Sequence, residues 1–137
     1  MCWQIYLAAD HGLPVIPWNV KAPDFHVTST SGKQLGGQMS KRLIYRVGSH
    51  EGCACGFGVL DPAEPSDMDR AGMRQLGLLA DYLQTATRRG PVELLVCWIG
   101  EEARPPDERM TVSPAFFREG YDDVFLSLSH RRLYTVE

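Results

Sequence analysis

The sequence predicts one α/β domain, in which a mixed sheet of about five to six strands carries one long helix; an α+β arrangement is the alternative. Three observations support this fold class. Several short runs favour strands, one long amphipathic stretch covers residues 66–89, and an almost continuous apolar run follows it over residues 92–99. The length of 137 residues fits a single domain, and no linker divides the chain.

The first part of the chain alternates between strand and loop signals. Residues 2–9 are rich in strand-forming side chains and contain neither Gly nor Pro, so they predict a strand. Three prolines within residues 14–23 exclude a helix and predict an extended segment on the surface. Residues 25–30 predict a second, short strand, and the Ser, Gly, Lys and Gln content of residues 28–41 predicts a loop.

Two further strand-like runs, residues 42–47 and 53–60, predict a hairpin because a short Gly-containing loop separates them. The register that buries the most apolar side chains places Tyr45 opposite Cys55. In that register Cys53 and Cys55 both point toward the core.

The long helix has clear start and stop signals. Ser66 and Asp69 have the spacing of a capping box, and Gly90 followed by Pro91 ends the pattern. Between them, apolar residues recur at spacings of three and four and predict one buried stripe. The stripe comprises Met73, Leu76, Leu79, Ala80 and Leu83.

The apolar run of residues 92–99 is typical of a strand that is buried on both faces. A hairpin, a helix and then a buried strand indicate a crossover, and hence at least one parallel pairing. The charged segment 100–109 contains two adjacent prolines and predicts a loop. A short helix is expected in residues 114–120, and strands are expected in residues 124–129 and 133–136.

Composition excludes some classes of partner. The net charge is -3, and basic residues occur only in scattered pairs, so we expect no nucleic-acid binding and no attraction to acidic membranes. No apolar run approaches the roughly 20 residues that span a bilayer. The first residues do not resemble a secretory signal, and the four cysteines are unevenly spaced. These features predict a cytoplasmic protein with reduced thiols.

The strongest chemical motif is formed by His50, Cys53 and Cys55, because thiolates and imidazoles are the ligands that zinc prefers. A closed zinc site needs a fourth ligand, and the spacing does not choose among Cys2, Cys97, His26 and His130. The competing interpretation has no metal and packs both motif cysteines as small hydrophobic residues, which is where free cysteine usually lies. The sequence favours this second interpretation, so no cofactor is predicted and zinc is the alternative.

A second candidate site lies directly after the buried strand, where Glu101 and Glu102 leave the sheet. Ligands of parallel α/β sheets bind beyond the carboxyl ends of the strands. Paired carboxylates there are suited to general acid–base catalysis or to holding a hard cation. The competing interpretation is that both carboxylates are merely solvated, as acidic side chains usually are.

These observations leave three hypotheses for function. The leading one is a binding or interaction domain for a small molecule or a protein, because the sequence contains no recognisable nucleophile–base pattern. The second is a thiol- or metal-dependent activity at the His50 motif. The third is a hydrolase-like or transferase-like enzyme that uses the carboxylates of the 100–109 loop.

Overall fold

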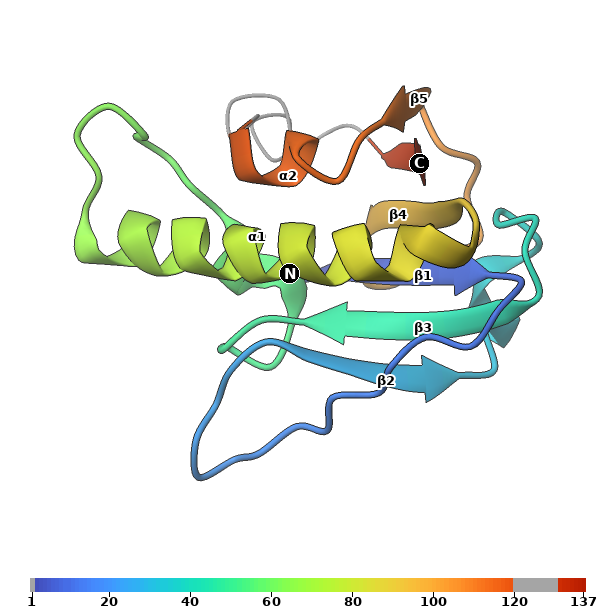
Figure 1. Ribbon diagram of the computed structural model, residues 1–137, viewed down its shortest axis with the longest axis horizontal. Coiled ribbons are helices and arrows are strands. Elements are labelled where there is room, and N and C mark those ends of the chain that lie inside the picture. Colours follow the sequence, from blue (N-terminus) through green and yellow to red (C-terminus); the bar gives the residue numbers. More distant parts are fainter. Residues whose placement is uncertain (1, 120–130) are drawn as a thin grey trace.

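A computed structural model describes residues 2–119 and 131–137 of the chain and has a six-stranded mixed sheet with one long helix packed on it (Figure 1). This confirms the predicted fold class. The strand order across the sheet is β2-β3-β1-β4-β6-β5. The strands are β1 (Trp3–Ala9), β2 (His26–Thr30), β3 (Leu43–Gly48), β4 (Val92–Trp98), β5 (Glu108–Val112) and β6 (Arg132–Val136). Within the described residues, none of the helices has the length and apolar character needed to cross a membrane.

The first strand lies at the centre of the sheet. β1 pairs antiparallel with β3 on one side and with β4 on the other, and β4 pairs antiparallel with β6. Among the described strands, β5 and β6 form the one parallel pair. The prediction of at least one parallel pairing is therefore confirmed, although this pair does not arise from the helical crossover. The helical crossover joins β3 to β4, which run in the same direction but are separated by β1.

The long helix α1 (Asp67–Ala86) begins and ends as its sequence predicts. The Asp69 backbone N–H donates to the Ser66 hydroxyl over 3.2 Å, and the Ser66 N–H donates to the Asp69 carboxylate over 3.0 Å, which completes the capping box. A short 3₁₀ turn, η3 (Thr87–Arg89), follows, and the chain leaves it at Gly90. The prediction of a helix over residues 66–89 is confirmed.

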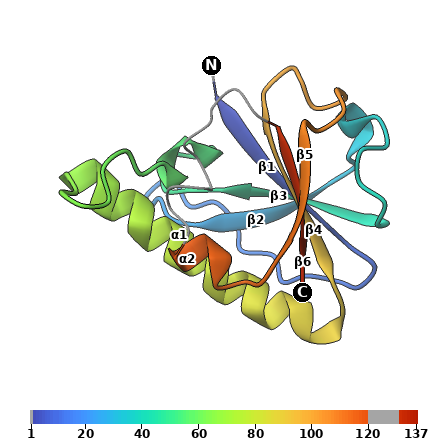
Figure 2. The same ribbon diagram turned by 90° about the horizontal axis from the view of Figure 1, so that it is seen from above.

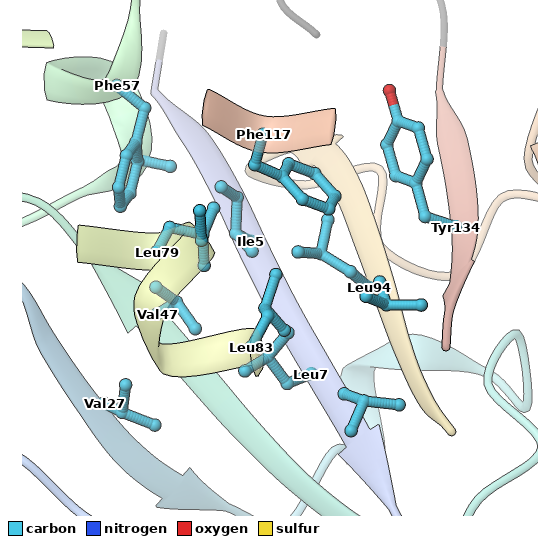
Figure 3. Close-up of a cluster of buried hydrophobic side chains, with 14 of the residues drawn as sticks. Ile5, Leu7, Val27, Val47, Phe57, Leu79, Leu83, Leu94, Phe117 and Tyr134 are labelled. Carbon is cyan, nitrogen blue, oxygen red and sulfur yellow. The ribbon is translucent and has the colours of Figure 1, made fainter. Parts of the chain in front are cut away.

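The main core lies between α1 and one face of the sheet (Figure 3). Alternate residues of the central strands point into it, as the pleat of a strand requires. The short helix α2 (Phe116–Glu119) packs beside α1 on the same face and adds Phe117 to the core (Figure 2). Fully buried members of this cluster include Ile5, Leu7, Val27, Val47, Phe57, Leu76, Leu79, Leu83, Leu94, Phe117 and Tyr134.

The other face of the sheet is covered by the segment that the sequence predicts as a loop. Leu35, at the end of the 3₁₀ turn η1 (Lys33–Leu35), packs there with Met39 against the sheet residues Tyr6 and Leu95. These contacts explain why β4 is buried on both faces, as predicted.

The predicted hairpin is wrong. Residues 42–47 correspond to β3, but residues 53–60 form no strand, and Ala54–Phe57 is the 3₁₀ helix η2. Tyr45 pairs with Leu7 and with Ser29 rather than with Cys55. The physical reason is that β1 and β2 occupy both edges of β3, so the following residues have no free edge to join.

Strand β5 was not predicted, and it begins inside the segment 100–109 that was expected to be a loop. The other elements match their predictions. The strand predicted in residues 25–30 is β2, and the strand predicted in residues 133–136 is β6. The short helix predicted in residues 114–120 is α2. The strand predicted in residues 124–129 lies outside the described residues.

Candidate functional site

A pocket of about 580 Å³ opens where β1 begins and β4 ends, between η2 and the first turn of α1. We call it the tryptophan pocket. Its volume falls in the range of about 300–1,000 Å³ that is typical of small-molecule sites. Its described lining residues are Trp3, His50, Glu51, Cys55, Gly56, Gly58, Val59, Leu60, Ser66, Asp67, Met68, Asp69, Ala71 and Trp98.

Much of the wall is apolar. The rings of Trp3 and Trp98 meet edge to face, with centroids 5.4 Å apart. Leu60 and Met68 also line the pocket, although they are 85% and 76% exposed. Exposed apolar side chains that gather around a concavity are typical of binding sites. These residues were not predicted as part of a site, because the sequence shows only scattered tryptophans and a turn-rich segment there.

The lining carries three acidic side chains beside the polar groups of His50 and Ser66. The acidic residues are Glu51, Asp67 and Asp69, and no Lys or Arg is among the described lining residues. Backbone N–H groups of Leu60 and Ser66 donate to Asp69 and lower the pKa of its carboxyl group, so it is ionised. Asp67 pairs with Arg70 on the outside of the helix. A ligand in the pocket therefore meets carboxylates, and the described part of the lining offers it no Lys or Arg side chain.

A network around the buried Ser49 side chain shapes the loop that forms one wall. Its hydroxyl donates to the Cys53 carbonyl over 2.6 Å and accepts from the Gly56 N–H over 3.1 Å. The turn between them passes through Gly52 with a φ of 85°, a conformation that favours glycine. These bonds hold the chain in a tight turn instead of a strand and carry Cys55 to the pocket wall.

Three of the four cysteines lie together. The sulfur atoms of Cys2, Cys53 and Cys55, which we call the thiol cluster, are all within 4.8 Å of one another. The prediction that Cys53 and Cys55 are buried in the core is wrong, because Cys53 is half-buried and Cys55 is exposed. Burial raises the pKa of the Cys53 thiol, so this thiol is protonated at neutral pH.

The other predicted ligands lie outside the thiol cluster. His50 lines the tryptophan pocket but is not part of the cluster, and its buried Nδ1 has no hydrogen-bond partner among the described residues. Cys97 is buried on the opposite face of the sheet. Burial, together with the Glu102 carboxylate, raises the pKa of the Cys97 thiol to about 12. His26 is buried at the start of β2 against the ring of Trp18, and His130 lies outside the described residues.

Glu101 and Glu102 lie at the carboxyl end of β4, but neither lines the tryptophan pocket. Glu101 accepts a 3.1 Å hydrogen bond from the guanidinium of Arg131, which is only 3% exposed and also donates to the carbonyls of Arg104 and Pro105. Within residues 2–119 and 131–137, Glu102 accepts a hydrogen bond from the nearby Gly100 N–H. Both strands beside β4 are antiparallel to it, so the crevice expected between parallel strand ends has no structural basis here.

The different partners of the two carboxylates lead to a prediction. We expect Glu101→Gln to lower the free energy of unfolding by about 1–2 kcal/mol, because the buried guanidinium of Arg131 loses its charged partner. Glu101 is partly exposed, so the loss should be smaller than for a fully buried pair. The matched change Glu102→Gln should have an effect within about 0.5 kcal/mol. Urea unfolding of both variants measures the difference. Equal losses of unfolding free energy in the two variants would contradict a stabilising role for the Glu101–Arg131 ion pair.

Comparisons of the chain with protein-family models, with curated proteins and with solved structures found no match.

Proposed function

We propose that this protein is a binding domain for a small molecule with an apolar body, either neutral or carrying a positively charged group, and that this ligand occupies the tryptophan pocket. The single observation that carries the proposal is the pocket itself, whose volume of about 580 Å³ suits a small molecule. Its wall joins apolar side chains to a few polar groups, which is the usual composition of a ligand site.

The charge of the wall supports the choice of ligand. Glu51, Asp67 and Asp69 belong to the lining, and no Lys or Arg is among the described lining residues. Anionic ligands would be repelled there, whereas an amine would be attracted. Indole rings such as that of Trp98 also attract cations through their faces.

A matched pair of probes tests this preference. The compounds 3-phenylpropylamine and 3-phenylpropionate share one apolar body and carry opposite charges at neutral pH. We expect NMR titration of the full chain to show binding of the amine at least about ten-fold tighter than binding of the acid, with shifts at Gly56, Gly58 and Leu60. Equal affinities would contradict the charge argument, and shifts confined to other regions would contradict the site.

A pair of variants tests the location independently of the probe. Ala71 belongs to α1 and lines the pocket, so Ala71→Phe should fill it and abolish amine binding. Gln84 is exposed on the same helix outside the pocket, so Gln84→Phe adds the same ring and should leave binding unchanged. Unchanged binding by Ala71→Phe, with the fold intact by circular dichroism, would place the ligand elsewhere.

A further inference from the structure

We propose that Cys2, Cys53 and Cys55 form a binding site for a thiophilic d¹⁰ cation, Zn²⁺ in the first instance, with three thiolate ligands and one open coordination position. This site goes beyond the proposed function, because it uses a different set of atoms and needs no small molecule in the pocket. It also replaces the ligand set that the sequence indicated, since Cys2 takes part and His50 does not.

The three sulfur atoms come from two parts of the chain that the fold brings together. Cys2 precedes the central strand β1, whereas Cys53 and Cys55 belong to the turn at η2. All of their mutual sulfur distances are within 4.8 Å. Thiolates that share one tetrahedral zinc ion lie about 3.8 Å apart, because each Zn–S bond is about 2.3 Å long. A shift of at most about 1 Å per pair, within reach of side-chain rotation, would complete the site.

Backbone contacts hold the cluster in place. The Ile99 N–H donates to the Cys2 carbonyl over 2.9 Å, which fixes the start of β1 against the end of β4. The Trp3 N–H donates to the sulfur of Cys55 over 3.4 Å. Hydrogen bonds from backbone N–H groups to sulfur tune metal–thiolate sites, and outer contacts of this kind orient the ligands.

The number of ligands indicates the character of the site. Closed structural zinc sites have four protein ligands, whereas sites with three protein ligands keep a position for water or another molecule. Cys55 is exposed and also lines the tryptophan pocket. The open position is therefore accessible to water, and a bound cation would add one Lewis-acidic centre beside the pocket wall.

Metal titration of the reduced full chain tests the proposal. Co²⁺ serves as the spectroscopic probe, because thiolate ligation gives intense near-ultraviolet charge-transfer bands and tetrahedral geometry gives strong visible bands. We expect one Co²⁺ per chain, displaced by one Zn²⁺, and a Zn²⁺-dependent rise in melting temperature in the absence of any organic ligand. A chain that binds neither ion at micromolar concentration, or binds Co²⁺ without thiolate bands, would overturn the site.

The cysteine series provides matched controls. Cys2→Ser, Cys53→Ser and Cys55→Ser should each weaken Zn²⁺ binding by about 100-fold or more, since loss of a ligand should cost at least as much as loss of an outer contact. Cys97→Ala removes the remaining cysteine, which lies on the other face, and should retain the affinity. Retained affinity in Cys2→Ser, or loss in a folded Cys97→Ala, would overturn the assignment.

Two measurements separate this proposal from the proposed function. Cys2 does not line the tryptophan pocket, so Cys2→Ser should lose Zn²⁺ and keep amine binding. Ala71→Phe should lose amine binding and keep Zn²⁺ binding. If the reduced protein binds no Zn²⁺ and instead forms a Cys53–Cys55 disulfide in air, as detected by mass spectrometry, the thiols act as a redox pair and the metal site is wrong.

Discussion

Leu76→Ala is expected to lower the free energy of unfolding by about 2–5 kcal/mol, because it removes a large side chain from a closed part of the core. Leu76 is 0% exposed and lies on the face of α1 that packs against the sheet. The central strands β1, β3 and β4 are hydrogen-bonded on both sides, which limits how far the sheet can close over the cavity.

Urea unfolding followed by circular dichroism measures this effect. Gln84→Ala is the matched control, because Gln84 lies on the exposed side of the same helix and its loss should change stability by less than about 0.5 kcal/mol. A loss below about 1 kcal/mol for Leu76→Ala would contradict the packing of α1 on the sheet.

The second large effect is expected from a glycine within α1. Glycine to alanine in a helix interior normally stabilises by up to about 1 kcal/mol. At Gly72 the sign should reverse, because a Cβ atom there would lie 2.2 Å from the carbonyl oxygen of Gly58. That oxygen belongs to the backbone, so the helix and the pocket wall would have to separate. We expect Gly72→Ala to lower the free energy of unfolding by about 1–3 kcal/mol.

Gly77 provides the control in the same helix. Among the described residues, a Cβ atom at Gly77 would meet the end of the Arg118 side chain at 3.3 Å. The guanidinium is bonded to the Gly77 carbonyl and to Asp81, but it is half-exposed and needs to shift by only a few tenths of an ångström. Gly77→Ala should therefore stabilise the protein by about 0.5–1 kcal/mol. Thermal and urea unfolding of the pair should show shifts of opposite sign. If both variants were stabilised, the close approach of α1 to Gly58 would be wrong.

The elements whose signals lie within a short stretch of sequence could be predicted. The capping box at Ser66, the apolar stripe of α1 and the continuous apolar run of β4 are local signals, and each appears in the structure. The hairpin prediction failed because it assumed that β3 pairs with the residues that follow it. Both edges of β3 are taken by earlier strands, β1 and β2. No local sequence pattern shows that these distant segments pair with β3.

The candidate site was only partly predictable for the same reason. The sequence singled out His50 and Cys55, and both line the tryptophan pocket. It could not choose Cys2 as a partner of Cys53, because the distance between them depends on how β1 enters the sheet. It also could not show that the carboxylate of Glu101 binds the buried Arg131, since that contact joins separate segments.

The central position of β1 has a consequence for how the chain folds. Its two partners, β3 and β4, are far along the sequence, so its pairing with Val96 of β4 closes a loop of about 90 residues. Chains dominated by such distant contacts fold slowly, in milliseconds to seconds. During synthesis, β4 leaves the ribosome roughly ten seconds after β1. For that time the apolar strand β1 has at least one edge without a partner strand. The unpaired edge of β1 is therefore more open to aggregation during this interval than in the finished sheet.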